Sequence, residues 1–216
     1  MYLQHWGLAE AVFRQGLDAR AFYAGPNQQE ALFRLDYLVA DRRRLGLVLG
    51  PTGSGKSLLL EVFAAEARRG GWQVAQVDLA GLDSPGFFHS VAVGLGLCPR
   101  DGIGTLELWP RVVDRIVAAR WQRQPTVILL DSVDRAAAEV LDDIVRLSEA
   151  DPDGDAHATL ILASARRAIA EWPKGLVERV ELRIDLEPFD LSATAGYLEH
   201  ELVRGGGRAS MFSESR

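Results

Sequence analysis

The sequence predicts an α/β fold in which five parallel strands form one sheet, sandwiched between helices. Two observations lead to this prediction. Short apolar segments typical of buried strands alternate with longer segments whose apolar residues recur at helical spacing. The first strand segment runs directly into a glycine-rich loop that precedes a helix. Strands separated by helices form parallel βαβ units, and a parallel sheet is covered on both faces.

Five segments are expected to be strands because each is short and mostly apolar. They span residues 45–49, 73–79, 126–130, 159–163 and 180–186. In the last segment Val180, Leu182 and Ile184 alternate with charged residues, which is typical of a strand with one buried face.

The segments with helical spacing lie between the strands and after the last one. They span residues 27–39, 58–69, 84–95, from 110 onward, 136–150 and 192–204. Gly70 and Gly71 are expected to stop the second helix, and Ser84 with Pro85 to cap the third. We expect Pro110 to begin the fourth, because proline is favoured in the first turn of a helix.

Composition limits the function classes. The 216 residues carry a net charge of -6, which counts against a protein held by bulk charge to nucleic acid or anionic lipid, although a local basic patch would still permit such contact. Cys98 is the only cysteine, so there is no intramolecular disulfide or thiolate metal cluster, and a cytoplasmic location is expected. No apolar run approaches the ~18 residues of a membrane span.

Residues 50–57 (GPTGSGKS) match the phosphate-binding pattern G-x-x-x-x-G-K-[ST]. Glycines let backbone N–H groups approach phosphates closely, and the following helix points the positive end of its dipole at the same anion. Lys56 would neutralise the phosphate oxygens, and the Ser57 hydroxyl would bind Mg²⁺. The expected nucleotide-binding residues are Gly50, Pro51, Thr52, Gly53, Ser54, Gly55, Lys56, Ser57 and Leu58.

The nucleotide is expected to be ATP. GTPases usually read guanine with an Asn-Lys-x-Asp loop, whereas Asn27 is the only asparagine here and neither Lys56 nor Lys174 lies in such a motif.

An acidic motif follows at residues 127–131, an apolar run that ends in Asp131. A carboxylate at such a strand end holds Mg²⁺ beside a P-loop, although Asp131 could instead cap the next helix. Enzymes of the ASCE/AAA+ type place glutamate directly after this aspartate, but this chain has Ser132, whose hydroxyl is no base near neutral pH. Asp134 could replace that glutamate if the loop bends back, or it could cap the next helix. The predicted catalytic residues are Lys56, Asp131 and Asp134, and the predicted metal ligands are Ser57 and Asp131.

Two further residues have two interpretations each. Ser164 ends a predicted strand where AAA+ proteins place a polar residue near the γ-phosphate, but it could be an ordinary strand-end hydroxyl. Arg179 could reach the ATP of a neighbouring subunit, or it could be one of several solvated surface arginines.

Several stretches resemble the ExeA/GspA-type AAA ATPases of general secretion pathways. They are residues 1–8 (MYLQHWGL), 22–23 (FY), 29–35 (QEALFRL), 184–189 (IDLEPF), 194–202 (TAGYLEHEL) and 211–215 (MFSES). The resemblance implies an AAA+ P-loop ATPase domain over residues 1–189, with an N-terminal linker over 1–26, and the first part of a helical lid over 190–216. It also implies self-association or a protein partner, and places Phe22 and Tyr23 near the adenine.

The chain departs from that family in two ways. Ser132 stands where the family has glutamate, and the chain stops at Arg216 before the lid's Gly-x-Pro-Arg motif. Either the protein is naturally short or the sequence is part of a longer one. The leading hypothesis is an Mg-dependent ATPase, slow and dependent on assembly, with a link to secretion. The alternatives are a non-hydrolysing switch that binds a protein partner, and an AAA regulator that targets DNA for transposition.

Overall fold

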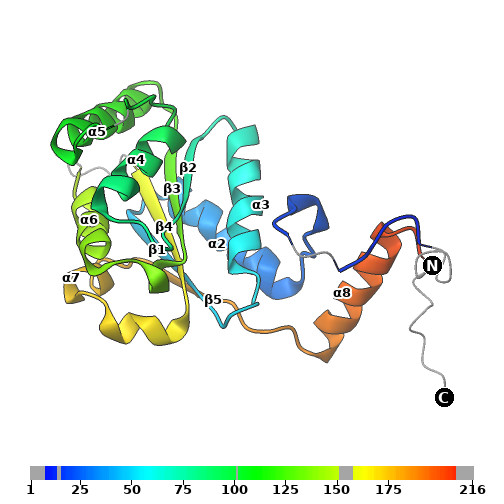
Figure 1. The fold of residues 1–216 in the computed structure, drawn as a ribbon. Coiled ribbons are helices and arrows are strands. Elements are labelled where there is room, and N and C mark those ends of the chain that lie inside the picture. Colours follow the sequence, from blue (N-terminus) through cyan, green and yellow to red (C-terminus); the bar gives the residue numbers. More distant parts are fainter. Residues whose placement is uncertain (1–7, 14–15, 101, 151–157, 208–216) are drawn as a thin grey trace, which may run out of the picture.

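The structure is a computed structural model that describes residues 8–13, 16–100, 102–150 and 158–207. One parallel sheet forms its centre, in the strand order β2-β3-β4-β1-β5 (Figure 1). The strands are β1 (Leu45–Leu49), β2 (Gln73–Asp78), β3 (Thr126–Asp131), β4 (Ala158–Ser164) and β5 (Leu182–Asp185). This confirms the predicted α/β fold class and each predicted strand to within a few residues at its ends.

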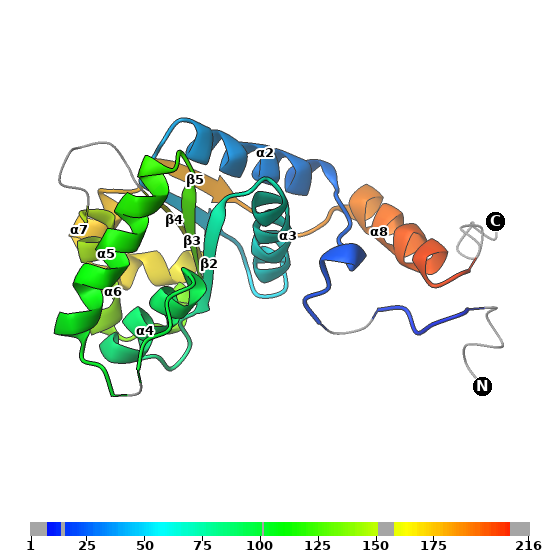
Figure 2. The same cartoon turned by 90° about the horizontal axis from the view of Figure 1, so that it is seen from above.

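Helices cover both faces of the sheet, with α2 and α3 on one face and α4, α5 and α6 on the other (Figure 2). The helices are α2 (Pro26–Ala40), α3 (Lys56–Arg69), α4 (Ser84–Gly94), α5 (Thr105–Trp121), α6 (Ala138–Ser148), α7 (Lys174–Val177) and α8 (Leu191–Arg204). Short 3₁₀ turns are η1 (Ala19–Ala21), η2 (Val133–Arg135) and η3 (Arg166–Glu171). None of the described helices is long and apolar enough to cross a membrane.

Strand alternation divides the core into two clusters. In β1, Leu45, Leu47 and Leu49 face α4, α5 and α6, whereas Val48 faces α2 and α3. All five β1 residues are buried, as expected for a central parallel strand. The sheet therefore fixes the direction of β1, and with it the point where the phosphate-binding loop begins.

The fourth predicted helix begins earlier than expected. Pro110 lies inside α5, which starts at Thr105 after Gly104, so the prediction that Pro110 begins this helix is wrong. Proline leaves the carbonyl of Leu106 without its helical donor, and Leu106 is 89% exposed, so water can replace that donor. The short helix α7 and the turn η3 had no predicted counterpart.

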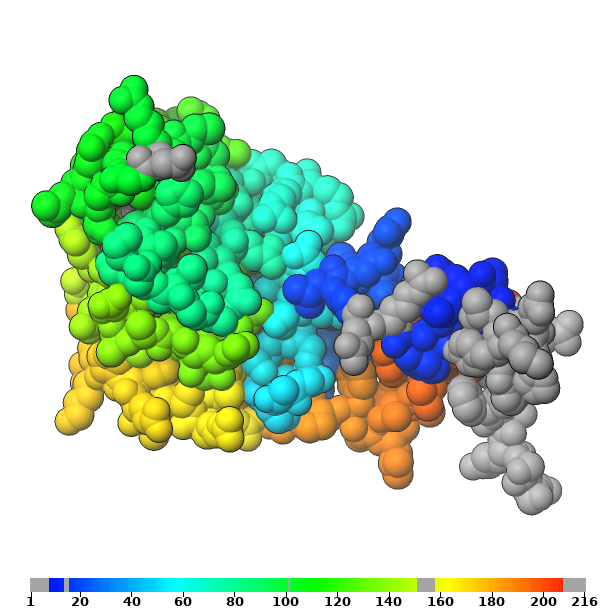
Figure 3. Space-filling view, in the orientation of Figure 1, coloured from blue at the N-terminus to red at the C-terminus, as the bar shows by residue number. Residues whose placement is uncertain are grey.

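Residues 8–13 of the N-terminal linker pack against α8, whereas Phe22 packs against the core of the sheet. Leu8 and Val12 form a small core with Leu202, and the Ala9 N–H donates to the Gly205 carbonyl at 2.7 Å. These two segments lie side by side at one end of the molecule (Figures 1 and 3). The assignment of residues 190–216 to a lid stays a prediction, and residues 208–216 lie outside the described part.

Candidate nucleotide-binding site

The phosphate-binding loop joins the carboxyl end of β1 to the first residue of α3. Gly53 and Gly55 have φ of +84° and +88°. Residues with a Cβ are strained in this conformation, so glycine is favoured at both positions. A Cβ on Gly50 would lie 2.7 Å from the Leu186 carbonyl oxygen, so the close approach of the chain after β5 also requires glycine there. Strand, glycine loop and helix therefore follow one another as the sequence predicts.

Lys56 points back into this loop. Its Nζ donates hydrogen bonds to the Gly50 and Pro51 carbonyls, both at 2.9 Å. Burial lowers the pKa of Lys56 below its ordinary value, while the charges of Asp134 and Asp131 act in the opposite direction. The ammonium group thus lies within electrostatic range of both carboxylates that the sequence singles out.

Asp131 ends β3 on the sheet face that carries α3. It alternates with Val127 and Leu129, which pack in the core beneath α3, so its carboxylate lies on the same side as Ser57 in the first turn of that helix. Its Oδ1 accepts a hydrogen bond from the Ser132 N–H at 2.7 Å. Asp131 does not cap α6, whose N-cap residue is Ala137 without a side-chain hydrogen bond.

The Asp131 carboxylate and the Ser57 hydroxyl are hard oxygen donors of the kind Mg²⁺ prefers. Within the described residues no group of three or more His, Cys, Asp or Glu side chains could hold a metal ion. Mg²⁺ usually keeps several waters and takes one or two carboxylates together with substrate phosphates, rather than an all-protein cage. The donors present therefore fit Mg²⁺ bound together with a nucleotide.

The loop after Asp131 bends toward β4. Ser132 has a left-handed conformation, with φ of 56° and ψ of 37°, and Asp134 lies in the turn η2. The Asp134 Oδ1 accepts a hydrogen bond from the Ala165 N–H at 3.1 Å. This fixes the carboxylate at the carboxyl edge of the sheet, and the alternative that Asp134 caps α6 is wrong. Its catalytic role stays a prediction.

Ser164 lies at the carboxyl ends of the strands, and Arg179 lies at their amino ends. Ser164 is fully buried at the end of β4, where its carbonyl accepts a hydrogen bond from the Gly50 N–H at 3.4 Å. Arg179 comes before the amino end of β5 and pairs with Glu149. Because the phosphate-binding loop lies at the carboxyl ends of the strands, Arg179 is remote from the loop of its own chain.

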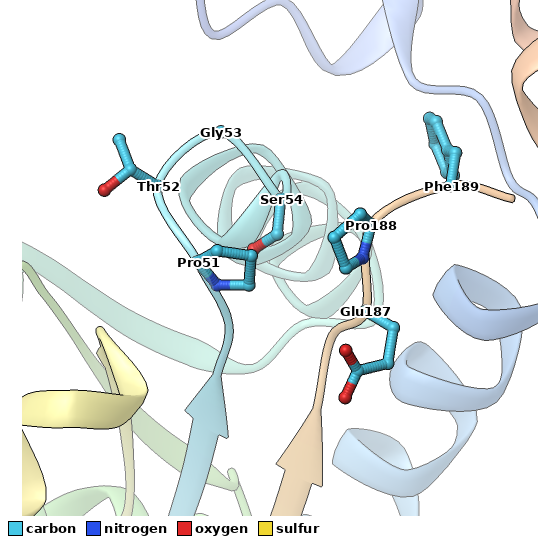
Figure 4. A pocket seen from close by; sticks show the side chains of 7 residues that line it. All are labelled: Pro51, Thr52, Gly53, Ser54, Glu187, Pro188 and Phe189. Carbon is cyan, nitrogen blue, oxygen red and sulfur yellow. The ribbon is translucent and has the colours of Figure 1, made fainter.

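A hollow of about 150 Å³ lies beside the phosphate-binding loop, between that loop and the segment that follows β5 (Figure 4). It is lined by Pro51, Thr52, Gly53, Ser54, Glu187, Pro188 and Phe189. The sequence did not identify the last three as site residues, although Pro188, three residues after the end of β5, could have indicated a bend there.

Aromatic side chains connect this hollow to the N-terminal linker. The rings of Phe189 and Tyr23 are 5.7 Å apart in an edge-on arrangement. Phe22 instead packs against the core beneath α2 and α3. Of the two residues expected near the adenine, Tyr23 is therefore the one next to the hollow.

Several solved structures have the same fold. Cdc6p from Pyrobaculum aerophilum has a TM-score of 0.69 and 18% identity over 90% of this chain and 55% of its own. ORC1 of Aeropyrum pernix, solved in complex with DNA, has a TM-score of 0.61 and 18% identity, over 86% of this chain and 50% of its own. AMPPCP-bound DnaA from Aquifex aeolicus has a TM-score of 0.57 and 17% identity, over 88% of this chain and 56% of its own.

The chain thus spans about half the length of these three proteins. No curated protein matches it in sequence. A family profile described as AAA domain matches residues 39–169, which include β1, the phosphate-binding loop, Asp131 and Asp134. This chain, with its parallel five-stranded sheet and phosphate-binding loop, therefore belongs to the AAA domain family of P-loop ATPases.

Proposed function

We propose that this protein binds ATP with Mg²⁺ and hydrolyses it slowly, in an assembly with copies of itself or with a protein partner. The observation that carries the proposal is the placement of Lys56, whose Nζ donates to carbonyls of the glycine loop that opens α3. The loop lies at the carboxyl ends of the strands, where Asp131 ends β3 and Asp134 is held beside the end of β4. A cation beside backbone N–H groups binds phosphate, and a carboxylate on the same edge can take a proton from water.

Each residue has a separate role in this proposal. The N–H groups of the loop and the amino end of α3 would hold the phosphates, and Lys56 would exchange its carbonyl partners for phosphate oxygens. Ser57 and Asp131 would hold Mg²⁺, which neutralises charge that develops on the phosphates. Asp134 uses Oδ1 to accept the Ala165 N–H, which leaves Oδ2 to orient and deprotonate water.

The test is a single-turnover experiment with trace radiolabelled ATP, Mg²⁺ and excess protein, in which retained and cleaved nucleotide are both measured. Lys56→Ala should abolish retention, because the backbone alone does not neutralise the triphosphate. Lys174→Ala is the matched control, since Lys174 begins the short helix α7, away from the loop. A cleavage rate that rises with protein concentration supports assembly, whereas no retention by the unmodified protein contradicts the proposal.

The alternative is a switch that binds ATP and a protein partner without hydrolysis. Ser132 supports it, because a residue that cannot act as a base occupies the position where related enzymes have glutamate. In the same experiment a switch retains ATP and releases no phosphate, at any protein concentration.

Two finer functions remain hypotheses. The stretches that resemble secretion-pathway ATPases support a link to secretion, whereas the DNA in the Aeropyrum pernix ORC1 structure supports a DNA-directed function. The net charge of -6 counts against DNA. ATP-stimulated retention of duplex DNA at physiological salt would favour the DNA-directed function, and its absence would leave the secretion hypothesis.

A further inference from the structure

Helix α5 has two apolar faces, and the fold buries one of them. The buried residues Leu108, Val112, Ile116 and Ala119 recur at helical spacing, on the side of the helix that packs against α4 and β3. A helix at the surface of a globular protein normally has polar and charged residues on its opposite face. The opposite face of α5 departs from this pattern.

That face carries a stripe of apolar residues along the whole helix. Its members lie three or four residues apart and are Leu106, Pro110, Val113, Val117 and Trp121. Leu106 is 89% exposed and Trp121 is 82% exposed. At 1.5 Å per residue the stripe is about 22 Å long. A continuous exposed apolar surface of this kind marks an interaction site, unlike apolar residues that are scattered singly.

The stripe lies away from both ends of the described chain. α5 is at the periphery of the molecule, whereas the first and last described segments meet at α8, at the other end (Figures 1 and 2). A second molecule can therefore reach the stripe.

The charges beside the stripe are complementary to those of a second copy of α5. Asp114 and Arg111 lie on the same flank of the stripe. Asp114 is exposed and forms no ion pair with a described side chain. Arg111 pairs with Glu107 through Nη2 at 2.6 Å and keeps further N–H donors. When two copies of one helix pack antiparallel, like flanks face each other, so Arg111 of each copy lies opposite Asp114 of the other.

We propose that two copies of this chain associate through α5, packed antiparallel about a two-fold axis beside Val113. The midpoint of the stripe lies between Val113 and Asp114, so Leu106 of one copy meets Trp121 of the second copy at both ends of the contact. Such a contact uses the same surface twice and closes with two chains. The inference rests on the proposed function for assembly between copies, and it does not depend on ATP binding.

The test is the molar mass of the full chain without nucleotide, measured by sedimentation over a wide range of protein concentration. The mass should rise from that of one chain to that of two. Leu106→Ser and Trp121→Ser should each raise the dimer Kd by about tenfold or more, because each removes a large apolar side chain from the contact. Leu191→Ser is the matched control, since Leu191 is 92% exposed on α8, outside the stripe, and should leave the Kd unchanged.

A charge exchange tests the antiparallel arrangement. Arg111→Asp and Asp114→Arg should each raise the dimer Kd by about tenfold, because each brings like charges together across the contact. The protein with both changes should regain the Kd of the unmodified protein, since opposite charges face each other again. Circular dichroism confirms that the variants keep their helical content.

A mass of one chain at every concentration overturns the inference. A dimer that both serine variants leave unchanged also overturns it, and a double charge variant that stays as weak as the single variants overturns the antiparallel arrangement. ATP retention is measured separately, so a monomer that retains ATP overturns the α5 contact alone, and a dimer that retains no ATP overturns the ATP-binding proposal alone.

Discussion

Lys56 is subject to two opposing effects at the residue scale. Its partial burial disfavours the ammonium form, and the charges of Asp134 and Asp131 favour it; burial is the larger effect, so the pKa is lowered. The sequence predicted the position of Lys56 in the loop. It could not predict this balance, which depends on carboxylates that the fold brings from β3 and η2.

ATP affinity should therefore decrease with rising pH before the ordinary lysine value is reached. The free protein loses the Lys56 ammonium at a pH below 10.5, and the neutral amine no longer attracts phosphate. The measurement is the Kd for ATP between pH 7 and pH 10, with circular dichroism to confirm that the fold persists. Lys56→Arg should give a flat profile, because arginine stays charged throughout; a flat profile in the unmodified protein contradicts the prediction.

Asp134 allows a second prediction at this scale. Asp134→Asn keeps an Oδ1 acceptor for the Ala165 N–H but removes the base, so cleavage should slow by about 10²–10⁴-fold with ATP retention unchanged. Asp142→Asn, a change on the exposed face of α6, is the control and should be neutral. Single-turnover cleavage measures both, and unchanged cleavage in Asp134→Asn would remove Asp134 from the reaction.

At the scale of elements, the sequence predicted the strands and loops that depend on local residue patterns. The apolar runs of β1 and β3 and the glycine loop before α3 are local signals, and the structure has each of them in place. Pro110 misled the prediction because proline starts many helices but is also tolerated near the start of one that begins earlier. The contact of Asp134 with Ala165 was not predictable, since it joins segments that only the parallel pairing of β3 and β4 brings together.

The packing of α4 on β2 gives a prediction at this scale. A Cβ on Gly94 would lie 2.7 Å from the Ala75 Cβ and 2.9 Å from its Cα, so the helix would have to move off the strand. Gly94→Ala should lower the free energy of unfolding by about 1–3 kcal/mol, although alanine is the better helix former. Urea denaturation measures this. A Cβ on Gly104 would have no neighbouring atom within 4 Å, so Gly104→Ala is the control and should change the free energy of unfolding by less than about 1 kcal/mol.

At the scale of the whole molecule, residues 8–13 meet α8 away from the sheet. Arg204 in α8 pairs with the nearly buried Glu201, with Nε–Oε1 and Nη2–Oε2 distances of 3.1 and 2.8 Å, and reaches Glu10 in the N-terminal linker. Phe189 connects this assembly to the hollow beside the phosphate-binding loop. Residues 8–13 and α8 are therefore placed to move together relative to the nucleotide site.

Arg204→Leu should loosen this end of the molecule selectively. It leaves the Glu201 carboxylate buried without its partner, which costs about 3–5 kcal/mol in comparable pairs. Amide hydrogen exchange in α8 should accelerate by more than tenfold, with β1, β3 and β4 unchanged. Arg183→Leu, which breaks the exposed pair with Asp185, should leave α8 protection unchanged. Equal acceleration throughout the sheet would show that the molecule opens as one unit.

The strand order also has a consequence for biosynthesis. β1 lies between β4 and β5, and Leu45 pairs with Leu160, 115 residues later in the chain. At ~5–20 residues per second a ribosome needs about 6–23 s to add those residues. Throughout that interval the emerging β1 lacks both of its neighbouring strands, so its apolar surface is available to chaperones. Nucleotide cannot stabilise the newly made protein until most of it has been synthesised.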